Sequence, residues 1–193
     1  MRDRDLVRLH WPPPLRPAFD ALLVLDDRLA EVALGAREPA LGAIKLAWWR
    51  DSLAALDTQP PPPEPVLRGI AAEVLPFGLN GEAVSALPEA WMAVLDERPD
   101  PAPRGVALFR LLGRLLGAQV VGGEAFARAD LARRTGVASW LQPVAGIAAQ
   151  RKVRPVTLLD ALGRRDTGRP WPPEPEATPG RALALLRHRL TGR

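Results

Sequence analysis

The acidic side chains best suited to do chemistry in this sequence lie between residues 20 and 31. Asp20, Asp27 and Glu31 are spaced by seven and four residues, so that a helix places all three on one stripe. Two carboxylates four residues apart on a helix can hold one Mg²⁺, the ion that enzymes acting on diphosphates use. We therefore take Asp27 and Glu31 as candidate metal ligands, and Asp26, Asp27 and Glu31 as candidate catalytic residues.

Asp26 has different surroundings from the other three carboxylates. It lies about 100° from its neighbour around the helix, on the apolar stripe of Phe19, Leu22 and Leu29. A carboxylate among apolar side chains is either paired or used for a task. A structural interpretation is therefore also open, in which the helix has an acidic outer face and Asp26 bonds to an arginine such as Arg50.

Several other chemistries are excluded by residue types that are missing or scarce. The chain of 193 residues has no cysteine, which excludes disulfides, thiolate catalysis and zinc sites built on sulfur. Its two histidines, His10 and His188, lie near the ends, which argues against a metal centre with several histidines. The sequence contains no Gly-x-x-x-x-Gly-Lys-Ser/Thr phosphate loop and no Gly-x-Ser-x-Gly elbow.

A second acidic cluster is also missing from the sequence. A magnesium–diphosphate site usually needs carboxylates on two facing helices, because several Mg²⁺ ions bridge the anion to the protein. Between Leu131 and Leu159 there is no aspartate or glutamate, and Asp160 and Asp166 are isolated among arginines.

The elements that must position these residues are helices. Apolar residues recur with helical spacing almost throughout, and no alternating strand of useful length is visible. The helix over 39–56 is apolar on two faces, which is typical of a central helix in a bundle. We predict helices at about 17–34, 39–56, 64–75, 81–97 (capped by Asn80), 103–118, 124–141, 155–163 and 180–190.

The length and composition indicate one all-α domain, a single bundle of six to eight helices. Hydrophobic residues make up 47% and charged residues 25% of the chain, which is the range of globular domains. We divide it into an extended N-terminal segment (1–16), a helical domain (17–163), and a Pro/Arg-rich segment with a C-terminal helix (164–193).

Charge is distributed unevenly along the chain. Residues 1–100 carry 10 basic and 16 acidic side chains, whereas residues 101–193 carry 16 basic and 6 acidic. This asymmetry can orient a protein on an anionic surface, and the last helix is either an amphipathic membrane or partner contact or a helix docked on the bundle. The basic segments lack interleaved aromatic residues, so we expect no nucleic acid partner. With no membrane span or secretory signal visible, we expect a cytoplasmic protein, with peripheral binding to the inner membrane as a further option.

Residues 37–53 carry a resemblance to a known family. Their Arg-Glu-Pro-Ala-Leu-Gly-Ala-Ile-Lys-Leu-Ala-Trp-Trp-Arg-Asp-Ser-Leu resembles a segment of the squalene/phytoene synthase family, particularly its short bacterial members. It is also similar to the assembly factors of mitochondrial respiratory complex I that belong to that family. Lys45 stands where arginine is usual, and the matching residues are Glu38, Pro39, Leu41, Gly42, Leu46, Trp48, Trp49, Arg50 and Asp51.

The resemblance implies a truncated isoprenoid-synthase-like fold. Active members condense two prenyl diphosphates head to head, with Mg²⁺ on two Asp-x-x-x-Asp motifs. Because this chain has no second motif and no tyrosine for the signature of active phytoene synthases, we predict a degenerate, non-catalytic member without a cofactor. It would act as a binding or assembly factor for a protein partner, or as a binder of a prenyl diphosphate or lipid. The alternatives are an active Mg²⁺-dependent prenyltransferase and a basic adaptor for an anionic membrane surface.

The family segment itself is interpreted as mainly structural. Adjacent tryptophans on a helix point about 100° apart, so we expect Trp48 and Trp49 to fill different layers between helices. Arg50 and Asp51 would be paired with neighbouring helices. The residues assigned this mainly structural role are Glu38, Pro39, Gly42, Trp48, Trp49, Arg50 and Asp51.

Overall fold

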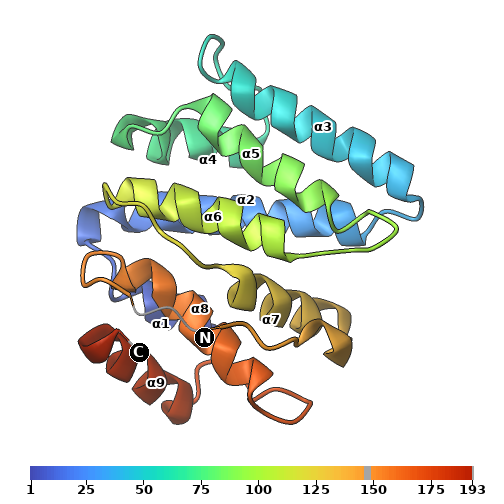
Figure 1. The fold of residues 1–193 in the computed structure, drawn as a ribbon. Coiled ribbons are helices and arrows are strands. Elements are labelled where there is room, and N and C mark those ends of the chain that lie inside the picture. The colour runs from blue at the N-terminus through green and yellow to red at the C-terminus, as the bar shows by residue number, and fades with distance from the viewer. Residues whose placement is uncertain (146–148, 193) are drawn as a thin grey trace.

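The computed structural model describes residues 1–145 and 149–192, and within these stretches the regular elements are helices with no strand (Figure 1). The expected all-α class is therefore confirmed, whereas the isoprenoid-synthase-like fold stays a prediction. The nine α-helices of the described stretches are α1 Asp3–Arg8, α2 Arg16–Leu34, α3 Pro39–Ala55, α4 Pro65–Glu73, α5 Gly81–Met92, α6 Ala102–Leu115, α7 Glu124–Thr135, α8 Arg154–Thr167 and α9 Pro179–Thr191.

Local sequence signals set the start of several helices. Helices α3, α4 and α9 begin at Pro39, Pro65 and Pro179, and proline is tolerated there because the first turn of a helix needs no N–H donor. Asn80 caps α5 as expected, since its side-chain oxygen accepts the N–H of Ala83 at 3.1 Å. Eight of the nine helices accordingly lie where the sequence predicts them.

Three helix ends differ from the expected ones. Helix α7 stops at Thr135 and not near 141, because Gly136 follows with φ 73° and ends the helix in the left-handed conformation. Helix α8 continues to Thr167, beyond the expected 163, and holds the buried Asp166 within the fold. Helix α5 passes through its internal proline but ends at Met92, short of 97.

The N-terminal segment 1–16 is not wholly extended, and that prediction is wrong for Asp3–Arg8. These residues form α1, which packs against α2, α8 and α9. A local bond supports its first turn, because the Asp5 carboxylate accepts the N–H of Arg2 at 2.6 Å. Helix α1 thereby brings the N-terminus of the chain onto its C-terminal half.

The helices are arranged around a middle pair, α2 and α6 (Figure 1). Helices α4 and α5 lie on one side of this pair with α3 outermost, and α1, α7 and α8 lie on the other side with α9 at the opposite edge. The core has large buried side chains, among them Phe19, Leu22, Leu29, Trp91, Phe109 and Leu112.

Helix α3 lies at the edge of the bundle, so its expected central position is wrong. Its inner face packs on α5 and α2, with Leu46 and Trp49 buried. The second apolar stripe is largely exposed: Leu41, Ile44 and Trp48 are 50%, 66% and 49% exposed. We call these three side chains the outer face of α3.

Candidate functional site

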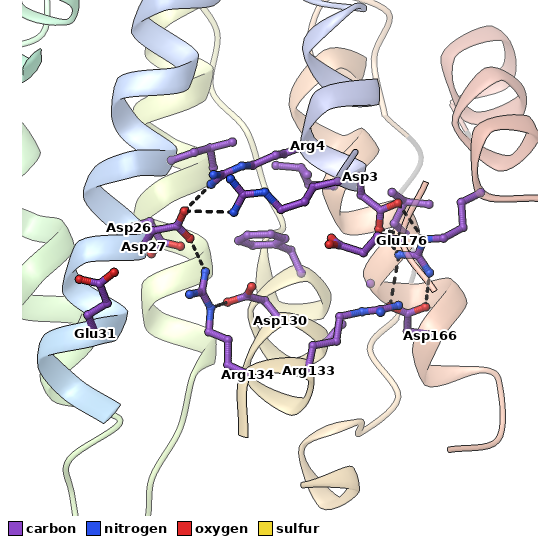
Figure 2. A pocket seen from close by; sticks show the side chains of 18 residues that line it. Asp3, Arg4, Asp26, Asp27, Glu31, Asp130, Arg133, Arg134, Asp166 and Glu176 are labelled. Carbon is purple, nitrogen blue, oxygen red and sulfur yellow. Dashed lines mark hydrogen bonds and ion pairs between the residues drawn. The ribbon is translucent and has the colours of Figure 1, made fainter. Parts of the chain in front are cut away.

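A cavity of about 400 Å³ lies between α1, α2, α7, α8 and α9, and it is lined mainly by charged side chains (Figure 2). Its apolar wall consists of Leu23, Phe126, Ala129, Leu159 and Leu162. All three candidate catalytic residues, Asp26, Asp27 and Glu31, line it as well. The site predicted from the sequence therefore faces a cavity, and the partners of each carboxylate decide what it can do.

Asp26 lies at the inner wall of the cavity and is almost fully buried. One carboxylate oxygen accepts the Trp91 indole N–H at 2.8 Å, and the other accepts an N–H of Arg104 at 3.3 Å. The expected burial and pairing are confirmed, but the suggested partner Arg50 is wrong. Arg50 instead bonds to its neighbour Asp51 at the surface.

Arg104 is the centre of this buried network. Its side chain is 0% exposed and also donates to Asp130 of α7 at 2.5 Å. The guanidinium lies 4.3 Å from the ring centroid of Trp91 and 5.4 Å from that of Phe126, so aromatic faces as well as carboxylates stabilise its charge. The network joins α2, α5, α6 and α7.

The two carboxylates that contact Arg104 differ in acidity. Burial raises the pKa of Asp26 above its ordinary value, and the nearby guanidinium of Arg104 offsets only part of that rise. Burial also acts on Asp130, but there Arg104 and Arg134 outweigh it and bring the pKa below its ordinary value. Asp130 is therefore more acidic than Asp26 and is the stronger counterion of Arg104.

Asp27, the main candidate metal ligand, is surrounded by arginines (Figure 2). Arg4 of α1 donates to one of its carboxylate oxygens, and Arg134 of α7 donates to the other at 2.5 Å. Arg2 lies 3.7 Å from the first oxygen. Three positive groups from two other segments thus hold the carboxylate that the sequence assigns to Mg²⁺.

Glu31 is not held in the same way. It lies one turn further along α2 at the rim of the cavity, and its carboxylate bonds to the exposed Arg28 at 2.7 Å. Asp20, the third member of the acidic stripe, bonds to Arg8 at 2.6 Å and does not line the cavity. The three carboxylates lie on one helix as expected, but each of them forms an ion pair with at least one arginine.

The residues present do not fit a bound Mg²⁺ ion. A magnesium ion requires oxygen ligands in near-octahedral arrangement, while both oxygens of Asp27 accept bonds from guanidinium groups. Over residues 1–145 and 149–192, no group of three or more histidine or acidic side chains is placed to hold a metal ion. We derive no metal-dependent step for this site.

A second ion-pair cluster closes the other end of the cavity. Arg181 of α9 is buried and donates to both Asp3 of α1, at 2.6 Å, and Asp166 of α8, at 2.5 Å. Asp166 also accepts from Arg133 of α7 at 2.8 Å. In the sequence Asp166 stands isolated among arginines. In the fold it is not isolated, because Arg133 and Arg181 are its ion-pair partners.

Several charged residues of the cavity were not singled out from the sequence. The spacing of Asp130 and Arg134, four apart on a helix, is the local signal that was available for one pair. No local signal exists for the others, because their partners lie far away in the chain. These residues are Asp3, Arg4, Arg133 and Arg181 in the lining, and Arg104 behind it.

The family segment divides between the core and the surface. Glu38 precedes α3 without a side-chain capping bond, and a Cβ on Gly42 would lie 2.9 Å from a methyl of Leu95, so that a side chain there would press on Leu95. Trp49 is buried, and Trp48 meets its ring edge to face with centroids 5.3 Å apart. The prediction that both indoles fill layers between helices is therefore wrong for Trp48.

No protein-family model, no curated protein and no solved structure matches this chain. The membership in the squalene/phytoene synthase family therefore rests on the resemblance of residues 37–53 and remains a prediction. What the site can do is argued below from its own contacts.

Proposed function

We propose that this chain is a non-catalytic squalene/phytoene-synthase-like protein that acts as a binding or assembly factor. One observation carries the proposal: Arg4 and Arg134 hold both carboxylate oxygens of Asp27, and Arg2 lies beside them. In an active relative the first aspartate motif would have to present free carboxylate oxygens to Mg²⁺. Here three cations stand where the metal ion would approach, and like charges at this distance repel.

The charge of the cavity also disfavours a diphosphate. Its lining contains five arginines and seven acidic side chains, and Arg104 behind the wall brings the arginines to six. Carboxylates therefore at least balance the guanidinium groups, and a strongly anionic ligand would have to displace them. This charge balance supports the interpretation of the cavity as an ion-pair network that joins helices, and not as a diphosphate site.

The outer face of α3 supports the binding role. Leu41, Ile44 and Trp48 follow one another with spacings of three and four residues, so that they form one continuous stripe on the helix. A contiguous apolar patch at the surface is typical of a site that contacts another protein. We assign the protein partner to this face.

A second candidate function is the binding of a prenyl lipid in the cavity. It is favoured by the apolar wall of the cavity and by the volume of about 400 Å³, which lies in the range of small-molecule sites. The charge balance requires such a lipid to carry a neutral or weakly charged head. Binding of dansylated farnesol in preference to farnesyl diphosphate would support this candidate.

The catalytic alternative is tested with labelled farnesyl or geranylgeranyl diphosphate and Mg²⁺. We expect no condensed product from the wild-type chain, because Asp27 has no oxygen free for the metal ion. Asp27→Ala is compared with Asp20→Ala, which removes a carboxylate of the same helix that bonds to Arg8 outside the cavity. Product made by the wild type and by Asp20→Ala, but lost in Asp27→Ala, would overturn the non-catalytic assignment.

The binding role is tested by photo-crosslinking in the cells that make the protein. A photoreactive benzoylphenylalanine in place of Trp48 should form a defined protein adduct, while the same group in place of Val121, which is 72% exposed outside this face, should not. Ile44→Asp should abolish the adduct, since a charge in the middle of the patch must be desolvated on binding. Equal adducts at both positions, or adducts that survive Ile44→Asp, would contradict the assignment.

A further inference from the structure

The outermost helix at the other edge of the bundle, α9, carries a second exposed apolar stripe. Leu183, Leu186 and Leu190 are 67%, 49% and 69% exposed, and their spacing of three and four residues places them on one side of the helix. Leu185 on the opposite side is buried against the body of the protein. Helix α9 is thus docked through one face and presents leucines with the other.

Basic side chains surround this stripe. The end of α9 is tied to the segment before α8, because Ala149 donates its N–H to the carbonyl of Gly192 at 3.1 Å and Arg154 donates to the carbonyl of Leu190 at 2.8 Å. The exposed Arg151 and Lys152 belong to that segment, and the exposed Arg187 lies on α9 itself. We call the three leucines with these basic residues and Arg189 the basic leucine face.

The positive charge of this face is not neutralised locally. In the described part of the chain, Arg151, Lys152, Arg187 and Arg189 form no ion pair with an acidic side chain, and Lys152 bonds to a backbone carbonyl. The sequence has no aspartate or glutamate from 177 to 193, nor between Leu131 and Leu159. In contrast, the guanidinium groups of the cavity are held by carboxylates.

We propose that the basic leucine face docks this protein on an anionic membrane surface. A helix with exposed leucines flanked by arginines lies in the plane of the lipid headgroups, where the leucines reach the acyl boundary and the arginines meet anionic lipids. Helix α9 is the outermost helix at its edge (Figure 1), so that no other helix drawn lies beyond it on that side. Over residues 1–145 and 149–192, none of the helices has the length and apolar character needed to cross a bilayer.

This docking would also orient the molecule. The basic leucine face and the outer face of α3 lie at opposite edges of the bundle (Figure 1). Residues 37–100, which include α3, carry 5 basic and 10 acidic side chains and would be repelled from anionic lipids, while residues 101–193 are net basic. The outer face of α3 would then point away from the membrane.

The test is co-flotation of the full chain with vesicles of phosphatidylcholine and phosphatidylglycerol in a ratio of two to one. We expect binding at about 0.1 M salt that falls steeply toward 1 M, where the Debye length drops from about 10 Å to about 3 Å. Vesicles of phosphatidylcholine alone should bind at least about tenfold more weakly, since the basic side chains gain nothing there. Equal binding to both kinds of vesicle would overturn the proposal.

Two sets of variants probe the two halves of the face. The first replaces its leucines, and the second removes two exposed charges through Arg151→Gln with Arg187→Gln. Each should lower the bound fraction at least about tenfold, while melting curves stay unchanged because the replaced side chains are exposed. The leucine variant combines Leu183→Ser, Leu186→Ser and Leu190→Ser.

The matched control removes apolar side chains from the opposite edge. Leu41→Ser with Ile44→Ser should float like the wild type, because the outer face of α3 does not touch the vesicle. If this control loses binding to the same extent, or if both sets of variants at α9 bind like the wild type, the proposal is wrong. The charge variant keeps the test valid should the leucine variant fail to fold. None of these outcomes depends on the activity assay.

Discussion

Arg104→Met should cost about 3–5 kcal/mol of the free energy of unfolding. Arg104 is fully buried and is the common partner of Asp26 and Asp130, so its loss leaves two carboxylates facing each other with less positive charge between them. Methionine replaces the aliphatic part of the arginine side chain and leaves out the guanidinium, so that the charge is lost with a smaller cavity than alanine would leave. Urea denaturation followed by tryptophan fluorescence measures the change, with Trp91 as an internal reporter beside the lost guanidinium.

The matched control for this variant is Arg8→Met. Arg8 also bonds to an aspartate, Asp20 at 2.6 Å, but the two side chains are 39% and 42% exposed. Exposed ion pairs contribute up to about 1 kcal/mol, so the control should change the unfolding free energy little. Equal losses in the two variants would show that burial of Arg104 does not set the strength of the network.

Gly163→Ala should lower the free energy of unfolding by about 3 kcal/mol or more. A Cβ on Gly163 would lie 2.4 Å from the carbonyl carbon and oxygen of Ala125 and 2.6 Å from the backbone nitrogen of Phe126. These are backbone atoms of α7, which cannot rotate away, so α7 and α8 must separate. The separation would also stretch the bonds that Asp160 of α8 makes to the N–H groups of Gly123 and Phe126.

Gly69→Ala is the control for the added methyl group. Gly69 lies within α4, and a Cβ there meets nothing within 4 Å. Alanine is the better helix former, so this variant should gain about 0.5–1 kcal/mol. Urea denaturation of the two variants side by side is decisive: if Gly163→Ala is as stable as the wild type, α7 and α8 are not in the close contact described here.

The helices could be predicted from the sequence because their signals are local. Apolar residues at helical spacing, prolines in first turns and the Asn80 cap all act within one or two turns of the chain. Helix α1 was missed for the opposite reason. It has six residues, four of them charged, and no apolar stripe of its own. Its docking depends on Asp3 and Arg4, whose partners Arg181 and Asp27 lie far along the chain.

The candidate site was predictable only in part. The apolar stripe around Asp26 correctly indicated a buried, paired carboxylate, but its partner Arg104 is 78 residues away and cannot be chosen by spacing. For Asp27 the residue type suggested a metal ligand, and only the fold shows that Arg4 and Arg134 meet there. The exposure of Trp48 could not be predicted either, since an apolar stripe does not show whether another helix of the same chain covers it.

The ion pair between Asp3 and Arg181 joins positions 178 residues apart. During synthesis on a ribosome, α1 leaves the exit tunnel long before α9 is made. Until then Asp3 lacks its partner Arg181. The wall of the cavity made by α1, α8 and α9 can therefore be completed only after α9 has been synthesised. A chain that stopped before residue 181 would lack the ion pair between α1 and α9.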